Sequence, residues 1–303
     1  MPGGCFPPED FRIERSQMLD AIDSEMNDKR RYAITRYIRT LFRGDLASLP
    51  RYGSREAVEQ LRVEDLTRAY QNLMKSASVE IMFVGGGSPD AALERFASVF
   101  EPFGSRTPLL MPDVFPGSEP RELTERMPVT QTKLIAGWTT GIGMNDPLSR
   151  PARVMSSLLS GPLSSLLFKE VRERLHLCYY CSSSFDRFRG VLTVESGIEE
   201  KQRDALLEAV DTQLRRVAEC DYPQELLEDT RMYLADSYRG VEDSLSAVEG
   251  FTLGQIMTGS SLTAEEELAA LLAVTREEIA EAASRLRPAL VYCLAGSGEE
   301  EDE

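Results

Sequence analysis

The chain has 303 residues, and this length together with an average composition predicts a globular protein of two domains. Its 34 basic and 50 acidic residues give a net charge of −16, which would repel the phosphate backbone of nucleic acids and anionic lipid surfaces. No run approaches the roughly 18 apolar residues that a membrane-spanning helix needs, and residues 1–11 lack a signal-peptide pattern. We therefore expect a cytoplasmic protein that binds neither nucleic acid nor membranes.

Histidine and cysteine limit the chemistry that the chain could carry. The five cysteines are an odd number and are scattered over a long chain, which favours reduced thiols over a disulfide framework. His176 is the only histidine. Any mechanism that needs two histidines in one chain is therefore excluded, including zinc sites of the two-histidine type.

The first part of the chain is predicted to be mainly helical. Apolar residues recur at helical spacing from Glu9 to about Phe42, and the short polar pair Asn27-Asp28 predicts a break there between two helices. A loop with Gly44, Pro50 and Gly53 follows. The further predicted elements are a helix over Val63–Met74, a strand over Val79–Val84, a turn over Gly85–Ser88 and a helix over Ala91–Phe100.

Five prolines between Gly104 and Pro128 predict a linker, with one edge strand near Glu122. Strands are then predicted over Lys133–Thr139, Cys178–Phe185, Val191–Ser196 and Ala289–Ala295, the middle two joined as a hairpin at Gly190. Helices are predicted over Pro151–Leu159, Leu163–Leu175, Lys201–Ala218, from about Pro223, near Glu265 and over Arg276–Leu286, with a break at Gly250–Gly259.

These elements predict an α+β fold in which a similar unit occurs twice. The predicted bounds are 1–104 for the first domain, 105–120 for the linker, 121–297 for the second domain and 298–303 for an acidic tail. The first domain has one clear strand against at least four in the second, and a sheet with so few strands leaves unpaired edges. We therefore expect the first domain to be incomplete, with its start missing from this chain.

One segment of the second half carries a specific motif. From Gly161 it reads GPLSSLLFKEVRERLHLCYY, in which a glycine loop, Ser-x-Leu-Phe, an acidic residue and Val-Arg-Glu are followed, seven residues after Arg172, by Tyr179. The pattern resembles the signature of the second domain of insulinase/pitrilysin-type zinc peptidases, with Cys178 where that family usually has glycine. The resemblance extends over nearly the whole chain. It implies two domains, each an antiparallel sheet with helices packed on it, around a substrate chamber.

The same resemblance implies that this chain lacks the catalytic metal site. Active members carry His-x-x-Glu-His and a later glutamate, which bind zinc and activate its water. The first motif is absent here, and the position of the later glutamate falls on Ala21, or on Glu25 if the alignment is shifted. We therefore expect no catalytic residue, no metal ligand and no cofactor in this chain, and zinc only in a partner subunit.

The leading hypothesis is a non-catalytic subunit that forms a homo- or heterodimer with a zinc-bearing peptidase subunit. Arg172 and Tyr179 would bind the peptide substrate in the shared site, the arginine at the backbone and the tyrosine at the developing oxyanion. One alternative is a purely structural or peptide-binding subunit, similar to the core proteins of respiratory complexes. Another is the later part of an active zinc metalloendopeptidase. The stretch Asn27–Ala33 also resembles the degenerate member of bacterial peptidase-like pairs, some of which are associated with elongation factor P modification.

Two further motifs are interpreted as structural. Cys178 and Cys181, with His176 nearby, could form a redox or metal site, but residues three apart on a strand point to opposite faces, so we expect the thiols to diverge and act as small buried hydrophobes. Gly85–Ser88 lacks the spacing of a phosphate-binding loop, and we expect a tight turn into the next helix.

Overall fold

The computed structural model describes residues 5–100, 115–117 and 119–297, which group into two compact units. Unit 1 contains residues 1–28, 49–111 and 241–260, and unit 2 contains residues 29–48, 112–240 and 261–303. Each unit is thus discontinuous in sequence, while the predicted bounds of 1–104 and 121–297 stay a prediction. Most of the predicted linker and the whole acidic tail lie outside the described residues.

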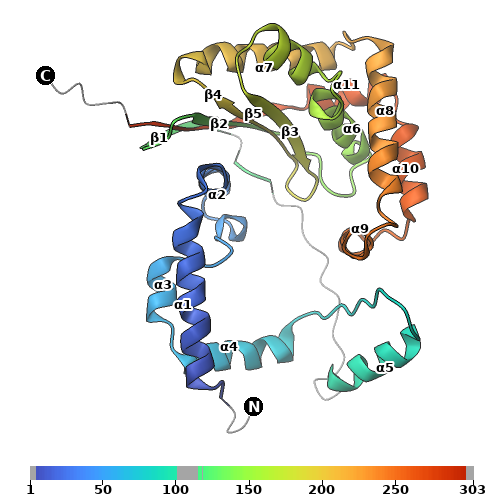
Figure 1. Cartoon of the computed structure of the whole chain (residues 1–303). Coiled ribbons are helices and arrows are strands. Elements are labelled where there is room, and N and C mark those ends of the chain that lie inside the picture. The colour runs from blue at the N-terminus through green and yellow to red at the C-terminus, as the bar shows by residue number, and fades with distance from the viewer. Residues whose placement is uncertain (1–4, 101–114, 118, 298–303) are drawn as a thin grey trace, which may run out of the picture. The chain divides into compact units, whose positions relative to one another are not determined.

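Unit 2 is built on one five-stranded sheet (Figure 1). The strand order is β1-β5-β2-β4-β3. The bounds are Arg121–Met127 for β1, Thr132–Thr139 for β2, Tyr180–Asp186 for β3, Val191–Ile198 for β4 and Arg287–Gly296 for β5. All five predicted strands of the second half, including the edge strand near Glu122, are confirmed.

The sheet is mixed, so the prediction of a purely antiparallel sheet is wrong. β2 pairs antiparallel with both β4 and β5, and β3 with β4, but β1 and β5 are parallel. The mixed pairing follows from the strand order. β2 runs in the direction opposite to β1, and β5 lies between β1 and β2. A strand antiparallel to β2 at that place is necessarily parallel to β1.

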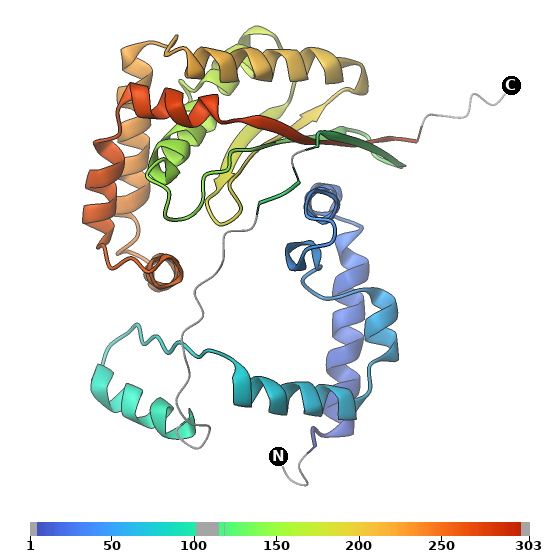
Figure 2. The same ribbon diagram turned by 180° about the vertical axis from the view of Figure 1, so that it is seen from behind.

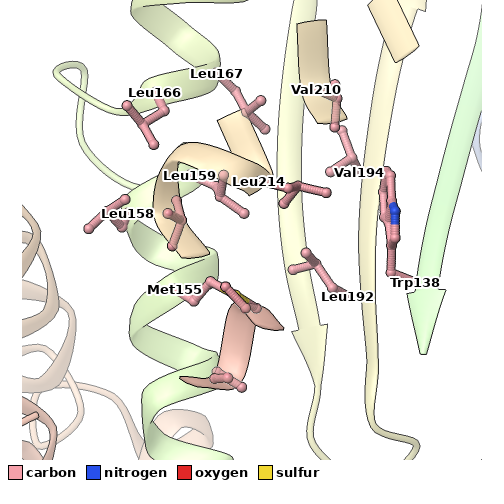
Figure 3. Close-up of a cluster of buried hydrophobic side chains, with 14 of the residues drawn as sticks. Trp138, Met155, Leu158, Leu159, Leu166, Leu167, Leu192, Val194, Val210 and Leu214 are labelled. Carbon is pink, nitrogen blue, oxygen red and sulfur yellow. The ribbon is translucent and has the colours of Figure 1, made fainter. Parts of the chain in front are cut away.

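Helices cover both faces of this sheet. One face packs against α6 (Ser149–Ser160), η4 (Leu167–Arg174), α7 (Arg203–Ala218) and α11 (Arg276–Ser284). Figure 3 shows the resulting apolar core, where Trp138, Leu192 and Val194 of the sheet face the helical side chains. The other face carries α2 (Lys29–Leu41), and Figure 2 shows the same arrangement from behind. Burial on both faces explains why apolar residues occupy consecutive positions in β2, β4 and β5.

The predicted helices of unit 2 are confirmed, with adjusted bounds. The helix predicted from about Pro223 is α8 (Gln224–Arg239), the one near Glu265 is α10 (Ala264–Leu272), and a short 3-10 turn, η5 (Glu200–Gln202), precedes α7. Thr263 and Thr275 begin α10 and α11 with reciprocal capping boxes. Both predicted helices on either side of Asn27-Asp28 are confirmed as α1 (Pro8–Glu25) and α2.

A close approach fixes α2 on the sheet. Tyr37 is buried, and its hydroxyl lies 3.3 Å from the hydroxyl oxygen of Thr193 on β4. A Cβ atom at Gly137 of β2 would lie 1.8 Å from the Tyr37 hydroxyl oxygen, so only glycine leaves room for the ring. Burial raises the pKa of Tyr37 to about 12, so its hydroxyl stays protonated.

Unit 1 consists of helices in the part of the chain that the structure describes. They are α1, α3 (Arg55–Gln60), α4 (Val63–Ser76), α5 (Pro89–Phe100) and α9 (Leu245–Thr258). An ion pair between Asp23 and Arg55 joins α1 to α3, and the rings of Phe6 and Tyr70 meet edge to face at 5.3 Å. The predictions of α4, α5 and the Gly85–Ser88 turn are confirmed, and the Ser88 hydroxyl accepts a hydrogen bond from the Ala91 N–H at 3.4 Å.

Two predictions in unit 1 are wrong. Residues 79–84 are not a strand, and the described residues of unit 1 contain no sheet, because a strand forms only against a hydrogen-bonding neighbour. The predicted break at Gly250–Gly259 is the helix α9. Gly250 lowers helix propensity without removing a backbone hydrogen bond, and the helix ends only at Gly259, whose φ is 66°. The helix α3 was not predicted.

The two units differ in how much apolar surface they bury. Among the described residues of unit 1, Val58 is the only hydrophobic side chain in the buried core. Its exposed large hydrophobic residues include Leu73, Phe83, Leu93, Phe96, Val99, Leu253 and Ile256.

Within the described ranges, none of the helices is long and apolar enough to cross a membrane.

Candidate functional site

Arg172 is positioned by a wide helical turn that is anchored in the core of unit 2. Leu167 and Val171 are fully buried, which directs the opposite side of η4 outward. The helix is a π-helix, and at its end the Leu175 N–H donates to the Glu170 carbonyl, five residues back, at 3.0 Å. The Arg172 guanidinium lies over the Phe168 ring, 4.8 Å from its centre, which holds the cation near the surface.

A short connection between η4 and β3 positions Tyr179. His176 has a φ of 51°, a left-handed conformation that reverses the chain after the helix. The Leu177 N–H then donates to the Val171 carbonyl at 3.1 Å, and the Tyr179 N–H donates to the Gly197 carbonyl of β4 at 2.9 Å. These bonds fix the backbone at Leu177 and at Tyr179, while Tyr179 itself is 63% exposed.

Arg172 and Tyr179 line the same cavity, whose volume is about 370 Å³. The remaining lining residues are Glu173, His176, Cys178, Glu199 and Gln202. Gln202 connects two sides of the cavity, because its side-chain N–H donates to the His176 carbonyl at 3.3 Å while its amide oxygen accepts from the Glu199 N–H at 3.4 Å. The site therefore combines a guanidinium, a phenol, an imidazole, a thiol and two carboxylates within one unit.

The two cysteines at this site differ in their ionisation. The pKa of Cys178 is lowered to about 7, chiefly by a hydrogen bond from the Cys181 thiol and also by the positive charge of Arg172. The hydrogen bond and burial raise the pKa of Cys181 well above its ordinary value. Cys178 is thus the member of the pair that carries negative charge near neutral pH.

The structure brings the two predicted site residues together at one cavity. β3 begins at Tyr180, so Cys178 precedes the strand, and the divergence of the Cys178 and Cys181 thiols stays a prediction. Both cysteines are half-buried and packed against the core, as expected of small hydrophobes. His176 is exposed and follows the end of the helix.

Sequence reasoning missed Glu199 and Gln202 as lining residues. They follow β4 in sequence, and only the pairing of β4 with β3 brings them to the motif. The capping-box pattern of Glu199 followed by Gln202 three residues later was a local signal for a helix start, but it carried no information about the cavity.

The residues present do not fit a catalytic zinc ion. Within the described ranges, no group of three His, Cys, Asp or Glu side chains is placed to hold a metal. Ala21, the position to which the resemblance assigned the third ligand, lies in α1 and offers only a methyl group. The described residues therefore do not supply the ligands that zinc-dependent hydrolysis would need.

Comparison with known proteins finds a family model that matches more than half of the chain. The family model described as "Peptidase M16 inactive domain" matches residues 60–234, a span that contains Arg172 and Tyr179. The chain is 24% identical to the "Probable inactive metalloprotease YmfF" of Bacillus subtilis (strain 168), over 98% of this chain and 70% of the relative.

Solved structures agree on the fold. The crystal structure of a conserved protein from Enterococcus faecalis V583 is similar with a TM-score of 0.88 and 29% identity, over 99% of this chain and 71% of that one. A chain of Complex III2 from Candida albicans is similar with a TM-score of 0.71 and 17% identity, over 93% of this chain and 70% of that one. At such low identity the second likeness concerns the fold alone.

Proposed function

Because the chain belongs to the family of the Peptidase M16 inactive domain, we propose that it is a non-catalytic subunit that binds peptides through Arg172 and Tyr179. The substrate would lie across the cavity of these two residues and be hydrolysed at the zinc site of a different, zinc-bearing partner subunit, in a heterodimer in the cytoplasm. The observation that carries this proposal is that both side chains line one cavity, although they come from a helix and from the connection after it.

The chemistry of the two side chains suits a peptide backbone. A guanidinium presents several N–H donors in a fixed plane and binds carbonyl oxygens or a terminal carboxylate, and a phenol donates one hydrogen bond. Neither contact depends on the side chains of the peptide, so the site would accept many sequences. The net charge of −16 favours peptides that carry basic residues.

Binding of a labelled peptide tests the proposal directly. The probe is a short, unstructured, fluorescein-labelled peptide rich in lysine and glycine, and fluorescence anisotropy measures its Kd. We expect Arg172→Ala to weaken binding by about 10- to 100-fold, since a hydrogen bond to a charged group contributes about 1.5–3 kcal/mol. Tyr179→Phe should weaken it less, because it removes one neutral donor.

Arg174→Ala is the matched control. It removes the same charge from the same helix, but Arg174 pairs with Glu170 at 2.6 Å and does not line the cavity. Its Kd should therefore stay within about twofold of the wild-type value, as for other exposed ion pairs. If both arginine variants weakened peptide binding equally, the effect would come from the net charge of the protein alone, which would contradict the assigned site.

The partner role needs a separate experiment with a zinc-bearing member of the family. Adding this chain should raise the partner's peptidase activity, and Arg172→Ala should abolish the increase while Arg174→Ala keeps it. If Arg172→Ala left the partner's activity unchanged, the shared site would be wrong even if the chain alone binds peptide.

Two alternatives predict different results. The first alternative is a purely structural subunit, in which case Arg172 and Tyr179 would affect only stability. The chain would instead be the later part of a zinc metalloendopeptidase if a zinc-binding segment preceded it. The chain spans 70% of the length of the Bacillus subtilis relative, and the sequence of the gene upstream decides this point.

A further inference from the structure

Unit 2 contains a second cavity, whose lining differs entirely from that of the candidate site. Its volume is about 670 Å³, which is within the range of about 300–1,000 Å³ that is typical of small-molecule sites. It is lined by α7, by α11 with the connection that follows it, and by one residue each of β2 and β5. Among the described residues, none lines both cavities. We name this second one the Trp138 cavity.

The buried part of this lining is apolar. Trp138 and Leu214 are each only 6% exposed, and Leu286 and Pro288 add further apolar surface. The pairing of β2 with β5 shifts between Gly137 and Trp138, which places Trp138 opposite Pro288. Proline has no N–H, so it cannot donate a hydrogen bond to the ladder there. A ligand in the cavity would therefore exchange water for contact with hydrocarbon and an indole ring.

The indole N–H of Trp138 is a hydrogen-bond donor without a partner in the part of the chain that the structure describes. Its nitrogen is also not one of the polar atoms that are both unpartnered and closed off from solvent. Because Trp138 is almost wholly buried and lines the cavity, its N–H is open to the cavity. Such a donor favours a ligand that offers an accepting oxygen.

The charged lining residues lie on one face of α7. Glu208, Asp211 and Arg215 recur at intervals of three and four residues, which is the spacing of neighbours on a helix surface. Within the described ranges, neither carboxylate accepts a hydrogen bond or forms an ion pair, whereas Arg215 donates to the Thr212 hydroxyl at 3.2 Å. Burial raises the pKa of Asp211, although the charge of Arg215 opposes this change. Two carboxylates against one guanidinium make the cavity suit a single positive charge.

We propose that the Trp138 cavity binds a small organic amine that has an apolar body and a carbonyl oxygen. The ammonium group binds the carboxylates of Glu208 and Asp211, and the apolar body packs on the buried lining. The carbonyl oxygen accepts a hydrogen bond from the indole N–H. The proposal needs neither Arg172 nor a partner subunit, so it stands or falls separately from the function proposed above.

Binding of L-leucinamide to the purified chain tests this proposal. Trp138 is the only tryptophan, so its fluorescence reports on the cavity directly. At pH about 6.5 the ligand carries its ammonium charge, and we expect a saturable shift of the emission to shorter wavelength, because the isobutyl group displaces water beside the indole. Isothermal titration calorimetry measures the same Kd independently of any change in fluorescence.

Two analogues of leucinamide each lack one of its recognised groups. Isocaproamide lacks the ammonium group, and we expect it to bind at least about 10-fold more weakly, since hydrogen bonds to charged groups are the stronger ones. Isoamylamine lacks the carboxamide, and its Kd should rise by about 3- to 10-fold, which is the effect of one neutral hydrogen bond.

Three variants on α7 separate the cavity from the net charge of the protein. Asp211→Asn should weaken leucinamide binding by about 3- to 10-fold, and Arg215→Ala should strengthen it by about twofold, because the charge–charge terms at this exposed rim are modest. Asp204→Asn is the matched control, since Asp204 pairs with Arg203 at 2.6 Å and does not line the cavity. All three replaced side chains are exposed, so the fold should be retained.

Three outcomes would overturn the proposal. The first is the absence of saturable leucinamide binding by both fluorescence and calorimetry. The second is equal affinity for leucinamide and isocaproamide, which would mean that the cavity recognises only apolar surface. The third is equal weakening by Asp211→Asn and Asp204→Asn, which would assign the effect to the net charge of the chain.

Discussion

Glu125 shows how a single half-buried carboxylate can connect a helix to the sheet. Arg36 of α2 donates to it through Nε at 2.9 Å, and the hydroxyls of Tyr32 and Tyr292 donate at 3.2 and 3.0 Å. Burial alone would raise the pKa of Glu125, but these hydrogen bonds outweigh burial and hold the pKa below its ordinary value. The ionised Glu125 carboxylate is therefore the form that holds α2 on the sheet.

This network predicts a pH-dependent loss of stability. Because the pKa of Glu125 is lower when the protein is folded, its contribution is fully present above the ordinary glutamate pKa of about 4.3 and is lost as the pH falls through the folded value. We expect Glu125→Gln to be less stable than the wild type at pH 7, with a difference that shrinks below about pH 4. The difference in stability is measured from the urea unfolding midpoints of the two proteins at several pH values between about 3 and 7.

The control for this prediction is Glu122→Gln on the same strand. The Glu122 side chain is mostly exposed and pairs with Arg203 at the surface, so the substitution should change the urea midpoint little. A constant gap between the wild type and Glu125→Gln at every pH would mean that ionisation of this carboxylate does not stabilise the fold.

At the scale of elements, α9 shows the limit of glycine as a sign of a break. A Cβ atom at Gly250 would meet nothing within 4 Å, and its backbone is helical, so alanine fits there. Gly259 ends the same helix with a φ of 66°, where a side chain is strained. The two glycines of one predicted break therefore have opposite structural roles.

Substitution by alanine separates these roles. We expect Gly250→Ala to stabilise α9 by about 0.8–1 kcal/mol through helix propensity, and Gly259→Ala to destabilise it by about 1–2 kcal/mol through the left-handed conformation. Hydrogen exchange of the amides in Leu245–Thr258 measures both, slower in the first variant and faster in the second. Effects of the same sign would mean that α9 does not end as described.

At the scale of the whole molecule, the buried apolar side chains lie almost entirely in unit 2. Its sheet is covered on both faces, whereas the described part of unit 1 buries a single core hydrophobe, Val58. Since burial of apolar area is the main source of folding free energy, the two units should differ in stability.

The single tryptophan makes this difference measurable. Trp138 is buried in β2 of unit 2, so its fluorescence follows that unit, while far-ultraviolet circular dichroism follows the helices of both units. We expect the dichroism transition to begin at lower urea concentration than the fluorescence transition. Coincident transitions would show one cooperative unit and would contradict the expected order.

The sequence alone determined what depends on neighbours along the chain. Periodicity predicted most helices and all five strands of unit 2, because each amphipathic pattern is a local property. The family resemblance of the segment from Gly161 predicted Arg172 and Tyr179 as the candidate site, and the comparisons confirmed the family to which that motif pointed. The presence of a single histidine excludes a two-histidine zinc site in this chain.

Tertiary structure decided what depends on residues far apart in the sequence. The place of β5 between β1 and β2 makes the sheet mixed, and no local pattern encodes strand order. Residues 79–84 alternate as a strand would, but they pair with no strand among the described residues, so the alternation alone predicted the wrong structure. Glu199 joins the cavity of Arg172 and Tyr179 because β3 pairs with β4. Strand pairing is a contact between distant segments, and its partners are chosen only when the whole sheet forms.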